Sequence, residues 1–179
     1  SRKQPDLNWE NPEVREAVYA MMRWWLDRGV DGFRMDVINM ISKDTGLHDG
    51  HVIAGGLYGD GTPYYICGPR IHEFLQEMHR EVFTGRSDRL LTVGEMPGVT
   101  VEEALPFTDP ARAEVDMVFQ FEHVNLDHGA NRFDPQPLDL LDLKASFGRW
   151  QAGLADNGWN SLYWNNHDQP RVVSRFGDD

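Results

Sequence analysis

The sequence is poor in cysteine and in basic residues, and it contains no long apolar run. Its 179 residues include 17 lysines and arginines against 29 aspartates and glutamates, which gives a formal net charge of −12. Nucleic acids and anionic membrane surfaces bind basic patches, so this composition disfavours both as partners. No apolar stretch approaches the roughly 20 residues that a membrane helix needs, and the residues after Ser1 do not resemble a secretory signal peptide.

The single cysteine and the scattered histidines limit redox and metal chemistry. Cys67 stands alone, so no disulfide can form within the chain, and a cytoplasmic location is expected. His48 and His51 have no further ligands nearby in sequence, and the glycine-rich stretch around Asp60 lacks the repeated acids of a calcium loop. The sequence therefore predicts no metal site and no cofactor.

The residues that are present have the composition of an ordinary globular protein, with 40% hydrophobic and 26% charged residues. Apolar periodicity and helix-capping signals predict helices over residues 12–28 and 69–83, with a short helix after the capping-box pair Thr100 and Glu103. A third long helix, which ends at residues 157–158, is predicted from its apolar face of Leu143, Phe147, Trp150 and Leu154. Strands are predicted over residues 32–38, 90–93, 117–121 and 161–164. This alternation predicts an α/β fold.

Two of the helices carry detailed predictions. Asn11 should cap the first helix, with Pro12 at its first position. The apolar face expected for this helix consists of Val14, Ala17, Val18, Met21, Met22 and Trp25. The buried stripe expected for the second helix consists of Ile71, Phe74, Leu75, Met78 and Val82.

The stretch GFRMDVI at residues 32–38 is the most informative in the chain. Arg34 and Asp36 are two positions apart, so on a strand they would point to the same side, and the arginine would compensate a buried carboxylate. A purely structural ion pair is one interpretation. Two further apolar runs also end in an acid, at Glu95 and at Asp168. In parallel α/β folds the carboxyl ends of the strands hold the ligands, which favours a functional interpretation.

Four stretches, in this order, resemble conserved regions of the α-amylase superfamily of glycoside hydrolases. They are QPDLN at residues 4–8, GFRMDVI at 32–38, GEMPG at 94–98 and NNHDQPR at 165–171. Within that superfamily the sequence is most similar to oligo-1,6-glucosidases and dextran glucosidases. The resemblance covers nearly the whole chain.

The resemblance implies a (β/α)₈ barrel, of which this chain would be a part running from the third helix to just past the seventh strand. A complete barrel takes about 250 residues, more than are present here. Residues 1–9 would be the tail of a small inserted domain. Residues 39–68 would form a long loop over the active site, although a plain surface excursion is the alternative.

The resemblance also assigns roles to the acids. Asp36 would be the nucleophile, Glu95 the general acid/base, and Asp168, with His167, would grip sugar hydroxyls. The residues themselves agree, because Arg34 should keep Asp36 ionised while the apolar neighbours of Glu95 should raise its pKa. The structural alternatives are that His167 caps a strand end and that Glu95 is a surface acid after a turn.

The expected activity is retaining hydrolysis of α-1,6, and also α-1,4, glucosidic bonds in isomaltose, panose and other isomaltooligosaccharides. Val37, directly after the expected nucleophile, is associated in the family with α-1,6 linkages; alternatively it simply packs beneath the first helix. A transglucosylase or a sucrose- or trehalose-type isomerase would use the same covalent intermediate. A non-catalytic transporter-subunit relative is a remote alternative, because such proteins typically lose catalytic carboxylates and carry a membrane span.

Overall fold

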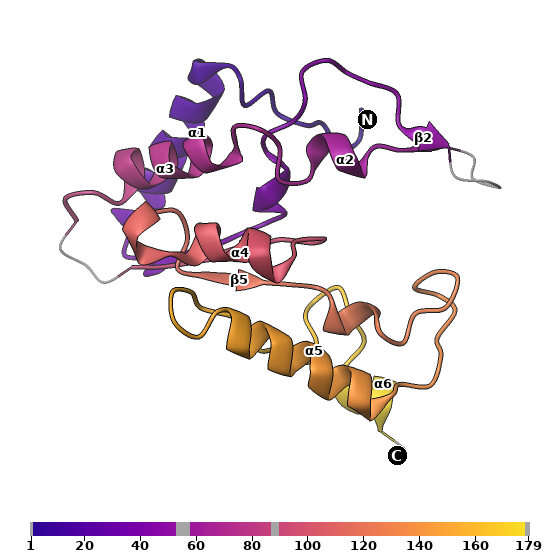
Figure 1. The fold of residues 1–179 in the computed structure, drawn as a ribbon. Helices are drawn as coiled ribbons and strands as arrows, with labels where there is room; N and C mark the ends of the chain where they lie inside the picture. Colours follow the sequence, from indigo (N-terminus) through magenta and orange to yellow (C-terminus); the bar gives the residue numbers. More distant parts are fainter. Residues whose placement is uncertain (1, 53–57, 87–89, 178–179) are drawn as a thin grey trace.

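The computed structural model describes residues 2–52, 58–86 and 90–177, which form an α/β arrangement around a parallel sheet (Figure 1). The sheet has three strands in the order β1-β4-β5, with bounds Gly32–Met35, Leu91–Glu95 and Met117–Phe119. The longer helices are α1 (Pro12–Leu26), α3 (Ile71–Val82), α4 (Val101–Thr108) and α5 (Leu140–Gly153). The remaining helical elements are α2 (Thr62–Tyr65), α6 (Val172–Phe176), and the 3-10 turns η1 (Ile38–Met40), η2 (Pro110–Arg112) and η3 (His123–Asn125).

The α/β class predicted from the sequence is confirmed, but the described strands make an open sheet and no closed barrel. Both pairings, β1 with β4 and β4 with β5, are parallel. Parallel neighbours end at the same edge, so the residues that follow the three strands lie on one side of the sheet.

Helix α1 begins as predicted, because the Asn11 side chain accepts a hydrogen bond from the Glu13 N–H at 3.0 Å and Pro12 opens the helix. The predicted apolar face is wrong in part. The buried residues are Tyr19, Met22 and Leu26, whereas Met21 and Trp25 are 48% and 45% exposed. The helix has apolar residues on more than one side, and contact with α3 decides which side is buried.

Helix α3 buries the five residues predicted for it, Ile71, Phe74, Leu75, Met78 and Val82. The capping box of α4 is also confirmed, since Thr100 accepts from the Glu103 N–H and Glu103 accepts from the Thr100 N–H at 2.8 Å. Helix α5 begins after Asp139, which caps it, and ends at Gly153, before the end predicted at residues 157–158.

Two predicted strands differ from the structure. The strand expected over residues 32–38 ends at Met35, because Val37 adopts a left-handed backbone with φ of 38°, which turns the chain away from the sheet. The strand expected over residues 161–164 is absent from the described sheet. A single parallel bridge joins Val118 to Asn160, with the Ser161 N–H donating to the Val118 carbonyl at 3.1 Å.

The expected loop over residues 39–68 contains short regular elements. The hairpin of β2 (His51–Val52) and β3 (Gly59–Asp60) is antiparallel and is followed by α2. Figure 1 shows β2 projecting away from the sheet. Gly55 and Gly56, which contributed to the loop prediction, lie outside the described residues.

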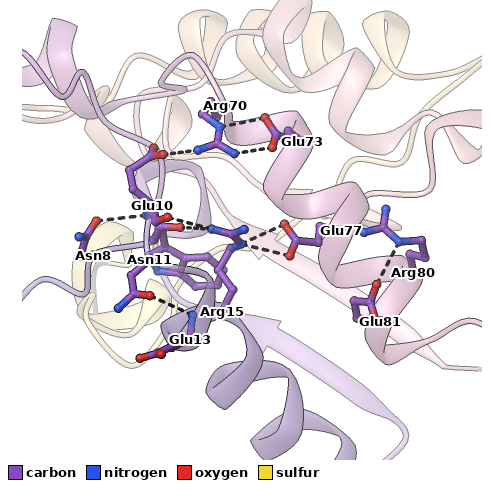
Figure 2. A network of polar contacts seen from close by, with 11 residues as sticks. Asn8, Glu10, Asn11, Glu13, Arg15, Arg70, Glu73, Glu77, Arg80 and Glu81 are labelled. Carbon is purple, nitrogen blue, oxygen red and sulfur yellow. Dashed lines mark hydrogen bonds and ion pairs between the residues drawn. The ribbon is translucent and has the colours of Figure 1, made fainter.

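The segment that leads into α1 is fastened to α3 by a network of charges (Figure 2). Arg15 donates to the carbonyl of Trp9 at 2.7 Å and pairs with Glu77 of α3 at 3.0 Å. Trp9 is buried against Tyr19 and Phe74. The backbone that precedes α1 is therefore held in place by both apolar and polar contacts.

No helix in the part of the chain that the structure describes is long and apolar enough to cross a membrane. No group of three or more histidine, cysteine, aspartate or glutamate side chains is placed to hold a metal ion there.

Candidate active site

The end of β1 delivers a guanidinium and a carboxylate to the carboxyl edge of the sheet. Arg34 lies within the strand and Asp36 directly after its last residue. Arg34 Nη1 donates to Asp36 Oδ1 at 2.6 Å, so the pair expected from the sequence forms. The Asp36 side chain is 71% exposed, which leaves its carboxylate open to an incoming molecule.

The end of β4 brings a second carboxylate to the same guanidinium. Glu95 is the last residue of β4, and the parallel register sets Met35 beside Gly94, so Glu95 arrives next to the end of β1. Arg34 Nη2 forms an ion pair with Glu95 Oε1, while the Val37 N–H donates to Glu95 Oε2 at 3.2 Å. Glu95 has no basic residue near it in the sequence, and Arg34 reaches it only because β1 and β4 are paired.

The two carboxylates differ in environment although they share one arginine. The Glu95 side chain is only 6% exposed, and burial raises its pKa, against the opposing effects of the Val37 N–H and Arg34. The hydrogen bond from Arg34 lowers the pKa of Asp36, against the opposing effect of burial. Both directions are those predicted from the sequence. One acid is therefore kept ionised, and the other holds its proton to a higher pH.

A cavity of about 340 Å³ opens beside these groups. Its lining consists of Arg34, Glu95, Phe119, Tyr163, Asn165, Asn166 and His167. Three of the six predicted site residues, Arg34, Glu95 and His167, thus meet at one cavity. Phe119 and Tyr163 lie edge to face at 5.2 Å and form an aromatic wall that sequence reasoning did not single out. Both residues lie in stretches predicted as strands, and nothing in those stretches indicates that the two rings meet at a cavity.

The remaining predicted residues, Asp36, Val37 and Asp168, are not among the lining residues of that cavity. The Asp168 side chain is 62% exposed and lies 3.3 Å from Nε2 of His167, measured at its Oδ2. Its backbone N–H donates to the side chain of Asn166 at 2.9 Å. Val37 is 37% exposed, in a turn rather than in the strand predicted for it.

A buried ion pair holds the segment that carries His167 and Asp168. Arg175 donates through Nε to Asp127 Oδ2 at 2.9 Å, through Nη2 to the carbonyl of Val124 at 2.7 Å, and through Nη1 to Oε1 of Gln169 at 3.3 Å. Its side chain is 9% exposed and that of Asp127 is 5% exposed. A larger cavity, of about 700 Å³, adjoins this pair between residues 127–138 and 169–177. It does not include Glu95, so the smaller cavity is the better candidate for bond cleavage.

Comparison with known proteins gives a consistent result. The family model for the catalytic domain of alpha amylase matches residues 1–179. An oligo-1,6-glucosidase from Halalkalibacterium halodurans is 63% identical over 100% of this chain and 32% of its own length. A crystal structure of trehalose-6-phosphate hydrolase from Bacillus licheniformis has a TM-score of 0.86 and is 46% identical, over 97% of this chain and 30% of its own.

A third similar protein has a different activity in its name. The trehalulose synthase from Pseudomonas mesoacidophila has a TM-score of 0.85 and is 38% identical, over 100% of this chain and 31% of its own. The chain therefore spans about a third of the length of each of these relatives.

Proposed function

Because the chain belongs to the alpha-amylase catalytic-domain family, we propose that it carries the catalytic acids of a retaining α-glucosidase. The substrates are short α-glucosides, foremost isomaltose, panose and other isomaltooligosaccharides, which are cleaved at α-1,6 and also at α-1,4 bonds. The observation that carries this proposal is the pairing of one guanidinium, that of Arg34, with an exposed Asp36 and a buried Glu95.

In the proposed first step a carboxylate oxygen of Asp36 forms a bond to the anomeric carbon as the bond to the leaving oxygen breaks. Glu95 gives its proton to that oxygen. The raised pKa of Glu95 suits a proton donor, and the lowered pKa of Asp36 suits a nucleophile. In the second step Glu95 takes a proton from water, which replaces Asp36 on the sugar. Arg34 orients both acids without exchanging a proton itself.

Asp168 and His167 are proposed to bind hydroxyl groups of the glucose ring. Their support is the NNHDQPR motif together with the position of His167 at the cavity and its contact with Asp168. Val37 is proposed to border the second sugar. Its exposed side chain sits in the turn directly between Asp36 and η1, and its N–H contacts Glu95.

The chain is proposed to be part of a longer (β/α)₈ barrel, running from the third helix to just past the seventh strand. Residues 1–9 would then be the tail of an inserted domain, and residues 39–68 a loop at the active site. The open sheet and the exposed apolar side chains Met21, Trp24 and Trp25 on α1 support a larger assembly, because such a face is normally covered. The complete enzyme is proposed to act in the cytoplasm.

The isolated chain of 179 residues should then be oligomeric or aggregation-prone and should hydrolyse glucosides poorly. Size-exclusion chromatography and a glucose-release assay on the isolated chain would measure both properties. A monodisperse monomer with the activity of the complete enzyme would contradict the partial-barrel proposal.

The proposed activity is tested on the complete enzyme by incubation with isomaltose and analysis of the products. Free glucose with retained α-configuration is expected in the first turnovers. A mechanism-based fluorosugar should label Asp36, as found by mass spectrometry of the digested protein. Labelling of another residue would contradict the assignment of the nucleophile.

An isomerase or transglucosylase is the second candidate, and the similarity to a trehalulose synthase favours it. The covalent glucosyl intermediate is the same, and only the acceptor that replaces Asp36 differs. Incubation with sucrose or with concentrated maltose separates the candidates. An isomerase would give a rearranged disaccharide from sucrose, and a transglucosylase would give a longer sugar plus one released glucose from maltose, whereas a hydrolase would give only monosaccharides. The non-catalytic transporter-subunit alternative predicts no turnover of any glucoside.

A further inference from the structure

Asn39 lies in the 3-10 turn η1, three positions after the proposed nucleophile. Asn39 is 0% exposed, which is unusual for a residue whose side chain has two polar atoms. The turn packs directly on the end of β4, because Gly94 has no side chain there. A Cβ at position 94 would lie 3.1 Å from Cγ2 of Ile38 and 2.6 Å from Cε of Met96. The turn after β1 and the end of β4 are thus in close contact.

The side chain of Asn39 ties this turn to the backbone that follows Glu95. Its Nδ2 donates to the carbonyl oxygen of Pro97 at 3.0 Å. Its own carbonyl accepts from the Cys67 N–H at 2.8 Å, which fixes η1 from the other side. Within the described residues its Oδ1 is buried with no hydrogen-bond partner. A buried orphan acceptor costs stability, so a positional role is a better explanation for this asparagine than stability alone.

We propose that Asn39 is a positioning residue for Glu95, an inference that rests on the proposed function. The same turn contacts Glu95 itself and the backbone that follows it. The Val37 N–H binds its carboxylate, and Asn39 binds the carbonyl two residues further along the chain. The turn that follows β1 and Asp36 therefore also determines the orientation of Glu95, the proposed proton donor.

A proton donor must be placed precisely relative to the leaving oxygen. General acid catalysis contributes about 10²- to 10⁴-fold, and a displacement of about 1 Å can cost about 10²-fold. Loss of the Asn39 donor should free the backbone at Pro97 and let the Glu95 carboxyl shift. The rate of bond cleavage should therefore fall only for substrates whose leaving group requires a proton. A purely structural contact would affect all substrates alike.

The experiment compares two substrates in the complete enzyme and in its Asn39→Ala and Asn39→Leu variants. Isomaltose releases a sugar that must be protonated, whereas α-glucosyl fluoride releases fluoride with little help from an acid. First-turnover product release isolates the step in which Glu95 acts as the acid. We expect this step to slow by about 10- to 100-fold with isomaltose and by less than about 3-fold with the fluoride.

Glu95→Gln and Ser42→Ala serve as references. Ser42 is also buried in the loop that follows η1, and its Oγ accepts from the Arg70 N–H at 2.9 Å, away from Pro97. Ser42→Ala therefore removes one buried hydrogen bond of the same loop and should slow both substrates equally or not at all. Glu95→Gln should show the full dependence on the leaving group.

The outcomes separate this inference from the function on which it rests. If Glu95→Gln shows the leaving-group dependence and the Asn39 variants do not, the positioning role is refuted and the proposed function stands. If Glu95→Gln does not show it, the acid assignment falls and the inference falls with it. Should Asn39→Ala fail to fold, Asn39→Leu keeps the size and branching of the side chain and removes the donor, and the ratio of its first-turnover rates on the two substrates decides.

Discussion

Glu95 and Asp168 both end apolar runs in the sequence, but the chain holds them in different ways. Glu95 ends a strand that is paired on both sides, by β1 and by β5. Asp168 follows a stretch whose sheet pairing is a single bridge at Asn160. The first carboxylate is buried and fixed, and the second is 62% exposed. Backbone pairing on both sides places a side chain precisely, whereas a segment paired at one point depends on side chains for its position.

The largest effect is expected for the nucleophile Asp36, which follows β1, the strand beside the one that ends in Glu95. In the complete enzyme Asp36→Ala should lower turnover of isomaltose by about 10³-fold or more, because no covalent intermediate can form. Steady-state kinetics with matched circular dichroism spectra would measure this. Retention of more than a tenth of the activity would show that Asp36, at the end of β1, has only a structural role. The contrast between the ends of the paired strands and the segment of Asp168 would then have no catalytic meaning.

Glu95→Gln should lower turnover of isomaltose by about 10²- to 10⁴-fold through loss of the proton donor. In the unmodified enzyme activity should fall as the pH rises through the raised pKa of Glu95, since the first step needs its protonated form. It should also fall as the pH drops through the lowered pKa of Asp36, which must be ionised. A pH profile of kcat/KM would show both limbs.

The singly paired segment is expected to depend on the buried pair of Arg175 and Asp127. Arg175→Met leaves a buried carboxylate unpaired and should cost about 3–5 kcal/mol in the free energy of unfolding. Arg149→Met is the matched control, because Arg149 and Glu122 form an exposed pair worth less than about 1 kcal/mol. Chemical denaturation measures both variants. If both variants lower the free energy of unfolding equally, Arg175 does not hold the segment of His167 and Asp168 in place.

A smaller effect is expected between the two acids of the paired edge, at Val37. Val37→Thr should narrow or reverse a preference for isomaltose over maltose, by about ten-fold, because a contact with the second sugar is worth about 1–3 kcal/mol. The ratio of kcat/KM for the two disaccharides is the measurement. An unchanged ratio would remove the linkage role of Val37 and leave the rest of the proposed mechanism in place.

Much of the local structure was predictable from the sequence. The cap at Asn11, the buried stripe of α3 and the capping box at Thr100 depend on residues within one or two turns of each other. The different environments of Asp36 and Glu95 were also predictable, since immediate neighbours already indicated a paired acid and an apolar one. Several features that the sequence did not predict involve contacts between distant residues, such as the aromatic wall of Phe119 and Tyr163.

The sequence by itself determined where α1 and α4 begin and which acids stand at the ends of apolar runs, because these depend on interactions between near neighbours. Only the tertiary structure decided that Arg34 serves Glu95 as well as Asp36, that Val37 leaves the strand in a left-handed turn, and which face of α1 is buried. The physical reason is that strand register and helix packing bring together residues far apart in the chain. Their mutual distance is set by the whole sheet and has no local signature.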